Sequence, residues 1–443
     1  MIAQNSALPL GEMSEGQRGP KKVLIISYYW PPAGGPGVQR WLKFVKYLPD
    51  FNVEPIVYVP ENPSYPIVDN SLEAEISKDL TIIKQPINEP YRLASMFSKK
   101  TSKTVSRGII SEHKKQTAIE RLMLYIRGNF FIPDARVGWV KPSVRFISDY
   151  INKNNIETII TTGPPHSMHL IGLQLKEKLG VKWLADFRDP WTTIGYHKQL
   201  KLTNRSRLKH KAFEQEVLNA ADQIIVTSNV TKKEFDEITQ KPITVITNGY
   251  DYEPIADFTL DKKFTLSHIG SLLSRRNPKV LWEVLRDLIQ EDDSFAKNFQ
   301  LNLVGAVSED VLLSIKQYNL SDYVNDFGYV SHKESVKLQK QSQLLLLVEI
   351  DSEETKCIIP GKLFEYLVSN RPIIALGPKG SDVEQIIKET NTGHYFLYSD
   401  YDAIKKIVLD HYESFKKGNL KSYAIGLQKY SRKALTKALS KLL

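Results

Sequence analysis

The segment IIPGKLFEYLVSNRPIIAL holds two residues, Lys362 and Glu365, whose types and spacing suit the binding of a nucleotide. A Pro-Gly pair opens a predicted helix that runs from Lys362 to Ser369, and Arg371-Pro372 ends it. Free N–H groups and the dipole at a helix start favour an anion such as phosphate, and Lys362 adds a positive charge. Glu365, one turn later, could accept two hydrogen bonds from the hydroxyls of a ribose. The segment therefore suits a nucleotide, but it equally fits an ordinary connection between a strand and a helix.

Polar and glycine-rich motifs also follow other predicted strands. They are Gly34-Gly35-Pro36-Gly37, His166 and Arg188-Asp189 in the first half of the chain, and Gly270-Ser271 with Arg275-Arg276 in the second half. Because ligands of doubly wound sheets bind at the carboxyl ends of the strands, these motifs predict a binding cleft between two sheets. Glycines permit close approach of the backbone to a ligand, and Arg276 could form a fork of hydrogen bonds with a phosphate. Each motif also has a structural interpretation: a proline-rich turn for the glycines and a solvated side chain for Arg276.

The two histidines of the motif GPPHSMHL have a spacing that occurs in metal sites. His166 and His169 lie one helical turn apart, a spacing that can hold a metal ion, but no acidic third ligand is nearby. We therefore predict no metal site, and either histidine could be a structural hydrogen-bonding group. Asp189 could pair with Arg188 or bind a hydroxyl of a sugar.

Short apolar strands alternate with helices along the chain, which predicts parallel sheets covered on both faces. The predicted strands are 21–28, 51–59, 158–162, 182–186, 221–227 and 243–246 in the first half, and 264–269, 301–304, 324–327, 344–348 and 372–376 in the second. The sequence thus predicts an α/β fold with two doubly wound, Rossmann-like domains that face each other across a cleft. We expect a loose tail at 1–20, a first domain at 21–250 with a basic insertion at about 91–140, a second domain at 255–415, and a C-terminal segment at 416–443 whose helix packs one apolar face.

Composition restricts the class of protein. With 443 residues, of which 42% are hydrophobic and 25% charged, the chain is an ordinary globular protein of two or three domains. The single cysteine, Cys357, excludes a disulfide framework and a cysteine-based metal site. The start of the chain has no apolar core of signal-peptide length, and no uncharged apolar stretch approaches the ~20 residues of a membrane-spanning helix. We therefore expect a cytoplasmic protein.

The net charge of +10 is unevenly placed. Between Tyr91 and Arg127 only Glu112 and Glu120 oppose a set of basic residues, namely Arg92, Lys99, Lys100, Lys103, Arg107, Lys114, Lys115, Arg121 and Arg127. Apolar side chains lie between these charges, so the stretch suits an anionic membrane surface. A solvated helical insertion is the alternative. Nucleic acid is not an expected partner, because no motif of a nucleic-acid-binding fold is present.

In their order along the chain, these motifs resemble the retaining glycosyltransferases of the GT-B fold in glycosyltransferase family 4. The segments that carry the resemblance are YYWPPAGGPGVQRWLKFVKYL, TTGPPHSMHLIGLQLKEKLG, DFRDPW, ITNGYD, HIGSLLSRRNP and IPGKLFEYLVSNRPIIAL, which span nearly the whole chain past Lys21. The opening YYWPPAGGPGVQRW, with RGNFFIPDARVGWVKPS, is similar to a subgroup common among bacterial enzymes of cell-surface polysaccharides.

The resemblance implies a role for each motif. The first domain would hold a glycan or lipid-linked acceptor, the second would hold a nucleoside-diphosphate sugar, and the terminal helix would cross back to the first domain. His166, Arg276 and Lys362 would be catalytic, and His166, Arg188 and Asp189 would lie near the acceptor or the sugar. The donor-binding residues would be Gly34, Gly35, Gly270, Ser271, Arg276, Lys362, Leu363 and Glu365. No metal or other cofactor is implied, and the protein would sit at the inner face of the membrane.

One position departs from the family pattern. The family often carries two glutamates separated by seven residues; Glu365 matches the second, but Cys357 occupies the position of the first. Glu353 and Glu354 are close to that position but out of register. The direct contact of a carboxylate with the donor sugar is therefore in question, and the identity of the sugar stays open.

Three other functions remain as alternatives. A sugar-nucleotide epimerase shares the architecture, but it would need acid and base carboxylates in the cleft, and the sequence shows few. A basic, non-catalytic module that binds membranes is the second. The third, a nicotinamide-dependent dehydrogenase, is disfavoured because AGGPGVQR does not fit the spaced glycine fingerprint GxGxxG.

Overall fold

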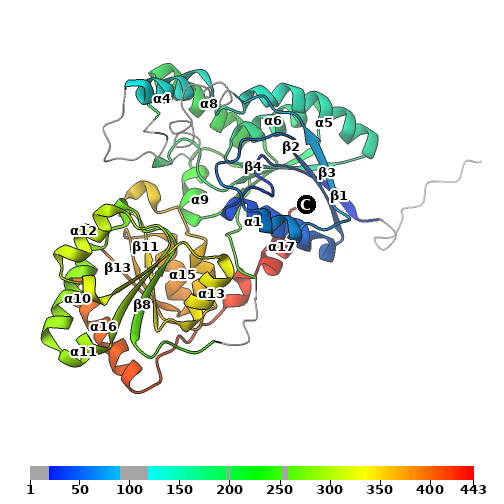
Figure 1. The fold of residues 1–443 in the computed structure, drawn as a ribbon. Helices are drawn as coiled ribbons and strands as arrows, with labels where there is room; N and C mark the ends of the chain where they lie inside the picture. Colours follow the sequence, from blue (N-terminus) through cyan, green and yellow to red (C-terminus); the bar gives the residue numbers. More distant parts are fainter. Residues whose placement is uncertain (1–18, 90–117, 196, 198–199, 252–257) are drawn as a thin grey trace, which may run out of the picture.

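The computed structural model describes all residues except 1–18, 90–117, 196, 198–199 and 252–257. It contains two sheets, each with helices on both faces, and they lie in two domains stacked one above the other in Figure 1. Every neighbouring pair of strands in both sheets is parallel. The predicted fold class, two doubly wound Rossmann-like α/β domains, is confirmed.

The first sheet has seven strands in the order β3-β2-β1-β4-β5-β6-β7. Its strands are β1 (Lys21–Ile26), β2 (Val53–Pro60), β3 (Thr81–Gln85), β4 (Thr158–Gly163), β5 (Lys182–Phe187), β6 (Gln223–Val226) and β7 (Ile243–Val245). The helices described in this half of the chain are α1 (Pro36–Tyr47), α4 (Ala118–Phe130), α5 (Val140–Asn154), α6 (Ser167–Leu179), α8 (Asn204–Ala220) and α9 (Asn229–Asp236).

The second sheet has six strands in the order β10-β9-β8-β11-β12-β13. Its strands are β8 (Phe264–Ile269), β9 (Phe299–Val304), β10 (Val324–Gly328), β11 (Leu344–Val348), β12 (Ile373–Leu376) and β13 (Gly393–Phe396). The helices of this half are α10 (Lys279–Glu291), α11 (Asp293–Asn298), α12 (Glu309–Gln317), α13 (His332–Gln341), α14 (Lys362–Leu367), α15 (Asp382–Thr390), α16 (Tyr401–Lys416) and α17 (Arg432–Ser440).

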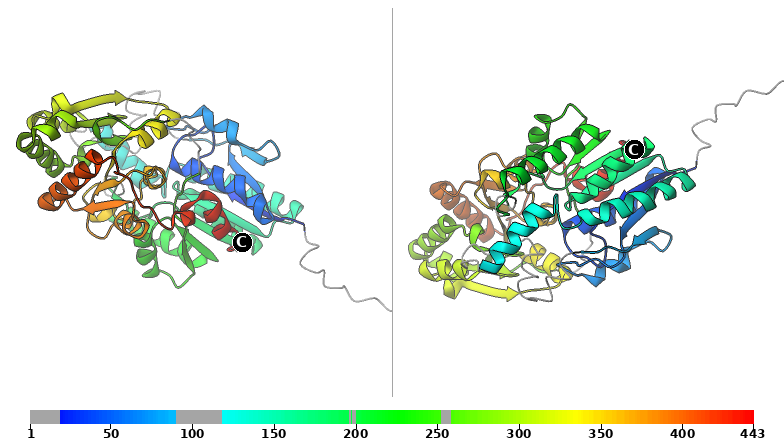
Figure 2. Two further views of the ribbon diagram at one scale, coloured as in Figure 1. Left: turned by 90° about the horizontal axis from the view of Figure 1, so that it is seen from below. Right: turned by 90° about the horizontal axis from the view of Figure 1, so that it is seen from above.

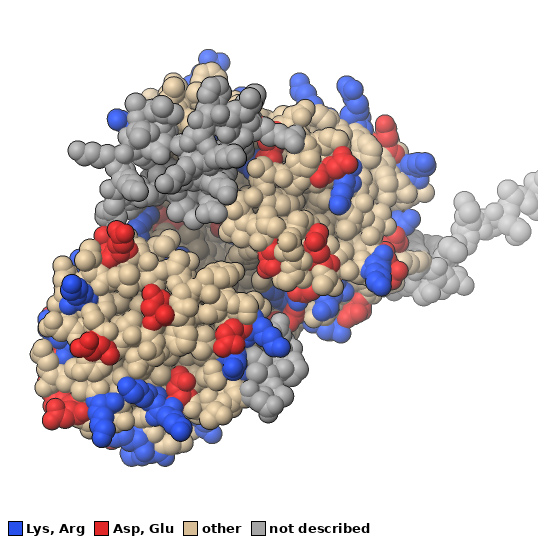
Figure 3. All heavy atoms as spheres, in the orientation of Figure 1, with Lys and Arg blue, Asp and Glu red and all other residues tan. Residues whose placement is uncertain are grey.

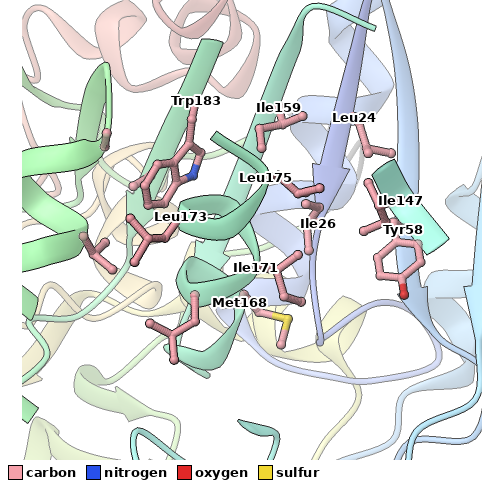
Figure 4. Close-up of a cluster of buried hydrophobic side chains, with 14 of the residues drawn as sticks. Leu24, Ile26, Tyr58, Ile147, Ile159, Met168, Ile171, Leu173, Leu175 and Trp183 are labelled. Atoms are coloured by element: carbon pink, nitrogen blue, oxygen red, sulfur yellow. The ribbon is translucent and has the colours of Figure 1, made fainter. Parts of the chain in front are cut away.

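The central strands β4, β8 and β11 are buried at every position, because helices cover each sheet on both sides. Leu24 and Ile26 of β1 belong to the core under α6, where Ile171 and Leu175 meet them (Figure 4). Val23 and Ile25 of the same strand belong to a second core, which packs against α1 and α17. Continuous burial of this kind explains why the sequence predicts β8 and β11 with their observed bounds.

The two strands that the sequence does not predict, β3 and β13, are edge strands of the two sheets. Neither is continuously apolar: β3 reads TIIKQ and β13 reads GHYF, and most of their residues are partly exposed. An edge strand has one neighbour, so its sequence carries a weaker hydrophobic signal than that of a central strand.

The end of the chain returns to the first domain. Through Tyr430 the chain still packs on the second domain, where the Tyr430 ring meets Phe364. The helix α17 begins two residues later, and Leu435 and Leu439 enter the core beside α1. Both views of Figure 2 show α17 against the first domain, beside α1. The crossing therefore lies near 430–432, later than the start of the predicted segment 416–443.

The predicted tail at 1–20 and the basic stretch after Tyr91 lie mostly outside the described residues. Within the part of the chain that the structure describes, none of the helices has the length and apolar character needed to cross a membrane.

Candidate active site

The positive charge of the site in the second domain is built at the carboxyl end of β8. Lys362, the first residue of α14, points its ammonium at His268, and Lys362 Nζ lies 2.7 Å from His268 Nε2. His268 is buried, and burial together with the charges of Lys362 and Arg276 holds the pKa of its imidazole well below its usual range. His268 is therefore neutral, and its ring nitrogen can accept a hydrogen bond from the lysine.

Burial also acts on Lys362 itself. It lowers the pKa of the Lys362 ammonium to about 7, with a second contribution from the positive charge of Arg276, while Glu365 opposes the shift. The lowered pKa means that burial disfavours the charged form of Lys362, and a bound phosphate would stabilise that form.

Gly270 lies beside this lysine. It lies after β8 with a φ of +105°, a conformation that side chains rarely adopt, and a Cβ there would sit 3.6 Å from Lys362 Nζ. The next residue, Ser271, is exposed at the same strand end. The structure therefore brings Gly270, Ser271 and Lys362 together, as the strand-end argument predicts.

Arg276 ends a short 3₁₀ turn at 274–276, close enough for its charge to act on Lys362 and His268. Among the described residues, its buried Nε has no hydrogen-bond partner. Burial lowers the pKa of the guanidinium, and the nearby Tyr398 and Glu349 oppose that shift. A buried guanidinium N–H without a partner is rare in folded proteins, and an anion in the cleft would satisfy it.

Glu349 is a further ionisable group of this region, and the sequence reasoning missed it. It follows β11 and is 3% exposed; its carboxylate accepts hydrogen bonds from Ser381 Oγ (2.8 Å) and Tyr395 OH (2.7 Å). Burial raises the pKa of Glu349 to about 7, although these hydrogen bonds and Arg276 act in the opposite direction. A polar residue directly after the apolar run LLLLV was the available signal, because it marks the carboxyl end of a strand.

The helix α14 is shorter than predicted and ends at Leu367 instead of Ser369. The N–H of Leu363 donates to Pro360 O at 3.0 Å, and that of Phe364 donates to Gly361 O at 3.2 Å. The Leu363 side chain is buried in the core beneath the helix. Both the side chain and the N–H of Leu363 are engaged within the protein, and its predicted donor contact stays a prediction. The anion-binding charge comes from Lys362 and Arg276 more than from this short helix.

Glu365 lies in another part of the site, where the two domains meet. Its Oε2 accepts a hydrogen bond from Gln339 Nε2 at 2.7 Å, and it lines a cavity of ≈ 170 Å³ between the domains. Gln39 of α1, Gly249 and Arg432 of α17 line the same cavity. The other carboxylate oxygen, Oε1, lies 4.0 Å from His332 Nδ1 and is not engaged by Gln339. This oxygen remains suited to a ribose hydroxyl.

The glycine turn of the first domain meets α14 across the boundary between the domains. Gly35, with a φ of +111°, begins α1, and a Cβ built on it would meet nothing within 4 Å. A Cβ on Gly361 would lie 3.6 Å from the Pro36 ring, so the turn and the start of α14 are adjacent. Gly34 packs closely instead, since its Cβ would come within 3.0 Å of Ile67. Of the two predicted glycines, Gly35 has the open side.

His166 sits at the start of α6 with its ring stacked on Trp191, at 4.7 Å between ring centroids. It is 4% exposed, and neither ring nitrogen has a hydrogen-bond partner among the described residues. Burial, with the nearby histidines, holds its pKa well below the usual range, so the imidazole is neutral. A neutral imidazole with both nitrogens unpartnered is suited to hydroxyl groups of a sugar.

Arg188 has a structural role that the sequence leaves open. Its Nε donates to Gly163 O at 3.2 Å and its Nη2 donates to Pro164 O, so it braces the loop before His166. A Cβ on Gly37 would overlap Arg188 Nη1, which explains the glycine there. Burial raises the pKa of the neighbouring Asp189 carboxyl, while Arg188 opposes this shift. The pairing of Arg188 with Asp189 was one of the two predicted roles.

Beneath the glycine turn lies an ion pair that the sequence reasoning also missed. Asp186 accepts hydrogen bonds from Arg40 Nη2 (2.9 Å), Trp41 Nε1 (2.8 Å) and Thr162 Oγ1 (2.8 Å). The side chains of Arg40 and Asp186 are at most 1% exposed, so the group is internal. It fixes α1 to the ends of β4 and β5 and thereby positions Gly35 and His166.

Cys357, at the position of the first family glutamate, lies at the boundary between the domains. Burial raises the pKa of its thiol to about 12, and the charges of Asp189 and Glu234 in the first domain add to the shift. The side chain is therefore a neutral thiol, and it cannot supply the carboxylate contact of the family pattern.

Comparisons with known proteins agree with the fold and the motifs. The family model described as Glycosyltransferase Family 4 matches residues 108–254, and comparison with curated proteins finds no match. Three solved structures are similar over nearly the whole chain: a glycosyltransferase from Rickettsia africae ESF-5 (TM-score 0.58, 14% identity, 96% of this chain and 93% of that chain), the lipopolysaccharide outer core galactosyltransferase WaaB (0.55, 14%, 95% and 98%), and Anabaena Alr3699/HepE in complex with UDP (0.54, 12%, 95% and 94%). At such identities the likeness shows the fold. The chain therefore has the GT-B fold, and its residues 108–254 match the model of glycosyltransferase family 4, the family that its motifs resemble.

Proposed function

We propose that this protein is a retaining glycosyltransferase that moves a sugar from a nucleoside diphosphate to a glycan or lipid-linked acceptor in the synthesis of a cell-surface polysaccharide. The observation that carries the proposal is the pair of half-buried cations, Lys362 and Arg276, at the carboxyl end of β8. In this proposal the unpartnered ring nitrogens of His166 in the first domain would bind the sugar, and Glu365, which lines the cavity between the domains, would bind the nucleoside.

The proposed reaction is a front-face displacement. The acceptor hydroxyl attacks the anomeric carbon from the side on which the diphosphate leaves, and a leaving phosphate oxygen takes the hydroxyl proton. Lys362 and Arg276 stabilise the charge that develops on the diphosphate, and such electrostatic stabilisation often contributes most of the rate enhancement. No protein nucleophile is needed, and configuration is retained. Cys357 leaves the sugar without the usual carboxylate contact, so the backbone of the Gly35 turn and His166 carry more of its recognition.

The direct test is a screen of nucleotide sugars. We expect one nucleoside-diphosphate sugar, and its nucleoside diphosphate, to raise the melting temperature, and we expect NMR of the product to show an anomeric configuration equal to that of the donor. Incubation of the donor without acceptor tests the epimerase alternative, because an epimerase would convert the sugar itself. Absence of any nucleotide-dependent shift would contradict the proposal.

Transfer is expected to survive excess EDTA. Two cations already face the leaving diphosphate, so a divalent metal ion is not required to neutralise it. The measurement is the initial rate with and without EDTA, followed by addition of Mg²⁺ or Mn²⁺. Complete loss of activity that Mg²⁺ or Mn²⁺ restores would show that the cationic pair does not replace a metal ion.

We also propose that the first domain lies on an anionic membrane. The described helix α4 exposes Leu122 (57%) and Phe130 (72%), and Leu208 of α8 is 68% exposed. Asn129 at the end of α4 accepts a hydrogen bond from the N–H of Thr203 just before α8, so these apolar side chains belong to one region, at the top of Figure 1. The basic stretch between Tyr91 and Arg127 runs into α4 in the sequence, and each cation near an anionic surface contributes about 1 kcal/mol.

Vesicle binding tests this surface. We expect co-sedimentation with anionic vesicles at low salt and weak binding to neutral vesicles. Binding to anionic vesicles should be largely lost at high salt, where the screening length shortens to a few ångströms. The triple change of Lys99, Lys100 and Lys103 to Glu, at positions outside the described residues, should reduce binding without loss of the fold.

The matched control reverses three exposed lysines on and after α16, Lys406, Lys416 and Lys417. Lysines and arginines gather at the lower edge of the second domain in Figure 3, away from α4, so this control should bind vesicles as the parent does. Equal binding by the Lys99, Lys100 and Lys103 variant and the parent would contradict this membrane face and leave α17 as the next candidate.

A further inference from the structure

A carboxylate of the second domain caps a helix of the first. Asp382, the first residue of α15, accepts hydrogen bonds from the N–H of Asn229 at 3.2 Å and the N–H of Val230 at 3.1 Å. Asn229 and Val230 begin α9, which lies at the boundary between the domains in Figure 1. Asp382 is 4% exposed, so the contact is internal.

The contact completes the N-terminus of α9. The first four N–H groups of a helix have no partner within it. In α9, Ser228 Oγ accepts a hydrogen bond from the N–H of Thr231, and Ser228 O accepts one from the N–H of Lys232. The N–H groups of Asn229 and Val230 remain, and Asp382 accepts hydrogen bonds from both. The first turn of α9 has no acidic residue of its own, so the negative charge that stabilises a helix start comes from the other domain.

The same segment is connected to the proposed donor site. Ser381, next to Asp382, donates a hydrogen bond from its Oγ to Glu349 at 2.8 Å and accepts one from the N–H of Val383 at 3.1 Å. Glu349 in turn faces the charge of Arg276. Hydrogen bonding therefore connects Glu349 with Ser381, which adjoins the cap on α9, and the charge of Arg276 acts on Glu349.

We propose that Asp382 is a positioning residue: by capping α9 across the boundary it holds the two domains closed over the donor site, and Ser381 and Glu349 connect this contact with Arg276. Separation of the domains removes both hydrogen bonds from a buried carboxylate, which disfavours the open arrangement. If the domains are already closed before the nucleotide binds, a larger fraction of the protein is competent to bind, and the apparent affinity for the nucleotide is higher. The link to nucleotide binding rests on the proposed function, whereas the closure itself does not.

The experiment compares Asp382→Ala with Asp292→Ala. Asp292 makes the same kind of cap, to the N–H groups of Ser294 (2.8 Å) and Phe295 (3.1 Å), but entirely within the second domain. It is therefore a matched control for the loss of a helix cap. Hydrogen exchange and small-angle X-ray scattering are measured on both full-length proteins without ligand.

In Asp382→Ala we expect amide exchange to rise about tenfold or more at Asn229 and Val230, as for loss of a charge-assisted hydrogen bond. Exchange should also rise at the turn around Pro36, which touches Gly361, and the radius of gyration should increase. Asp382→Asn keeps one acceptor oxygen and should fall between the parent and the alanine variant. A radius of gyration, and an exchange of the Gly35 and Gly37 amides beside Pro36, equal to those of Asp292→Ala would overturn the proposal.

The link to Arg276 is tested with Glu349→Ala, which removes the partner of Ser381, against Tyr395→Phe, which keeps that partner but removes the contacts of the Tyr395 hydroxyl with Glu349 and Pro378 O. Amide exchange at Asn229 and Val230 should rise in Glu349→Ala and stay unchanged in Tyr395→Phe. Equal exchange in the two variants would refute the link. UDP is then titrated, with an expected affinity loss of about tenfold in Asp382→Ala and none in Asp292→Ala. If UDP fails to bind the parent, the proposed donor is in error, while exchange and scattering still decide the closure.

Discussion

Replacement of Lys362 with alanine is expected to lower kcat by ~10²-fold or more, because it removes an ammonium aimed at the charge that develops on the leaving diphosphate. The side chain is held in place by its hydrogen bond with His268. The measurement is steady-state transfer with the donor found in the nucleotide screen. Lys356 is the matched control, since it lies on the same loop and pairs with the exposed Glu353; Lys356→Ala should keep near-parental kcat.

The pH dependence gives Lys362 a second readout. Burial lowers the pKa of its ammonium to about 7 in the free protein. Below that pH the side chain is charged and binds the diphosphate; above it the charge is lost, so donor affinity should weaken as pH rises through 7 and beyond. In Lys362→Met the affinity should be low and this dependence should vanish. A folded alanine variant with near-normal turnover, or an unchanged pH profile in Lys362→Met, would refute the assignment.

Arg276→Ala is expected to have a comparable effect, again ~10²-fold or more in kcat. Its guanidinium has an Nε without a partner among the described residues, and a fork of donors can hold a phosphate in two places. Arg276→Lys should recover only part of the activity, because an ammonium restores the charge without the fork.

The neighbouring Arg275 supplies the control for this variant. It is exposed and belongs to the same 3₁₀ turn, so Arg275→Ala tests whether the turn itself matters. Parental turnover in folded Arg276→Ala, or equal losses in the two alanine variants, would argue against a specific role of Arg276 on the leaving group.

The sequence by itself determined the architecture and the main charged groups of the candidate site. The run LLLLV is apolar at every position, and only a strand covered on both faces needs that pattern. Because parallel strands end at one edge of a sheet, the residues that follow them are predicted to meet there. Gly270, Arg276 and Lys362 do so, with neither an alignment nor a structure needed to select them.

Only the tertiary structure decided which groups face one another. His268 and Lys362 are far apart in the chain, as are Asp382 and Asn229, and no local pattern encodes such pairs. In the sequence, Glu349 does not differ from other polar residues that follow a strand. Only the tertiary structure shows that it is buried beside Ser381. The same packing buries the Leu363 side chain in the core and gives Arg188 a bracing role. Local sequence sets the type and ends of each element, whereas burial and partners depend on how distant elements pack, and these fix the charges of the site.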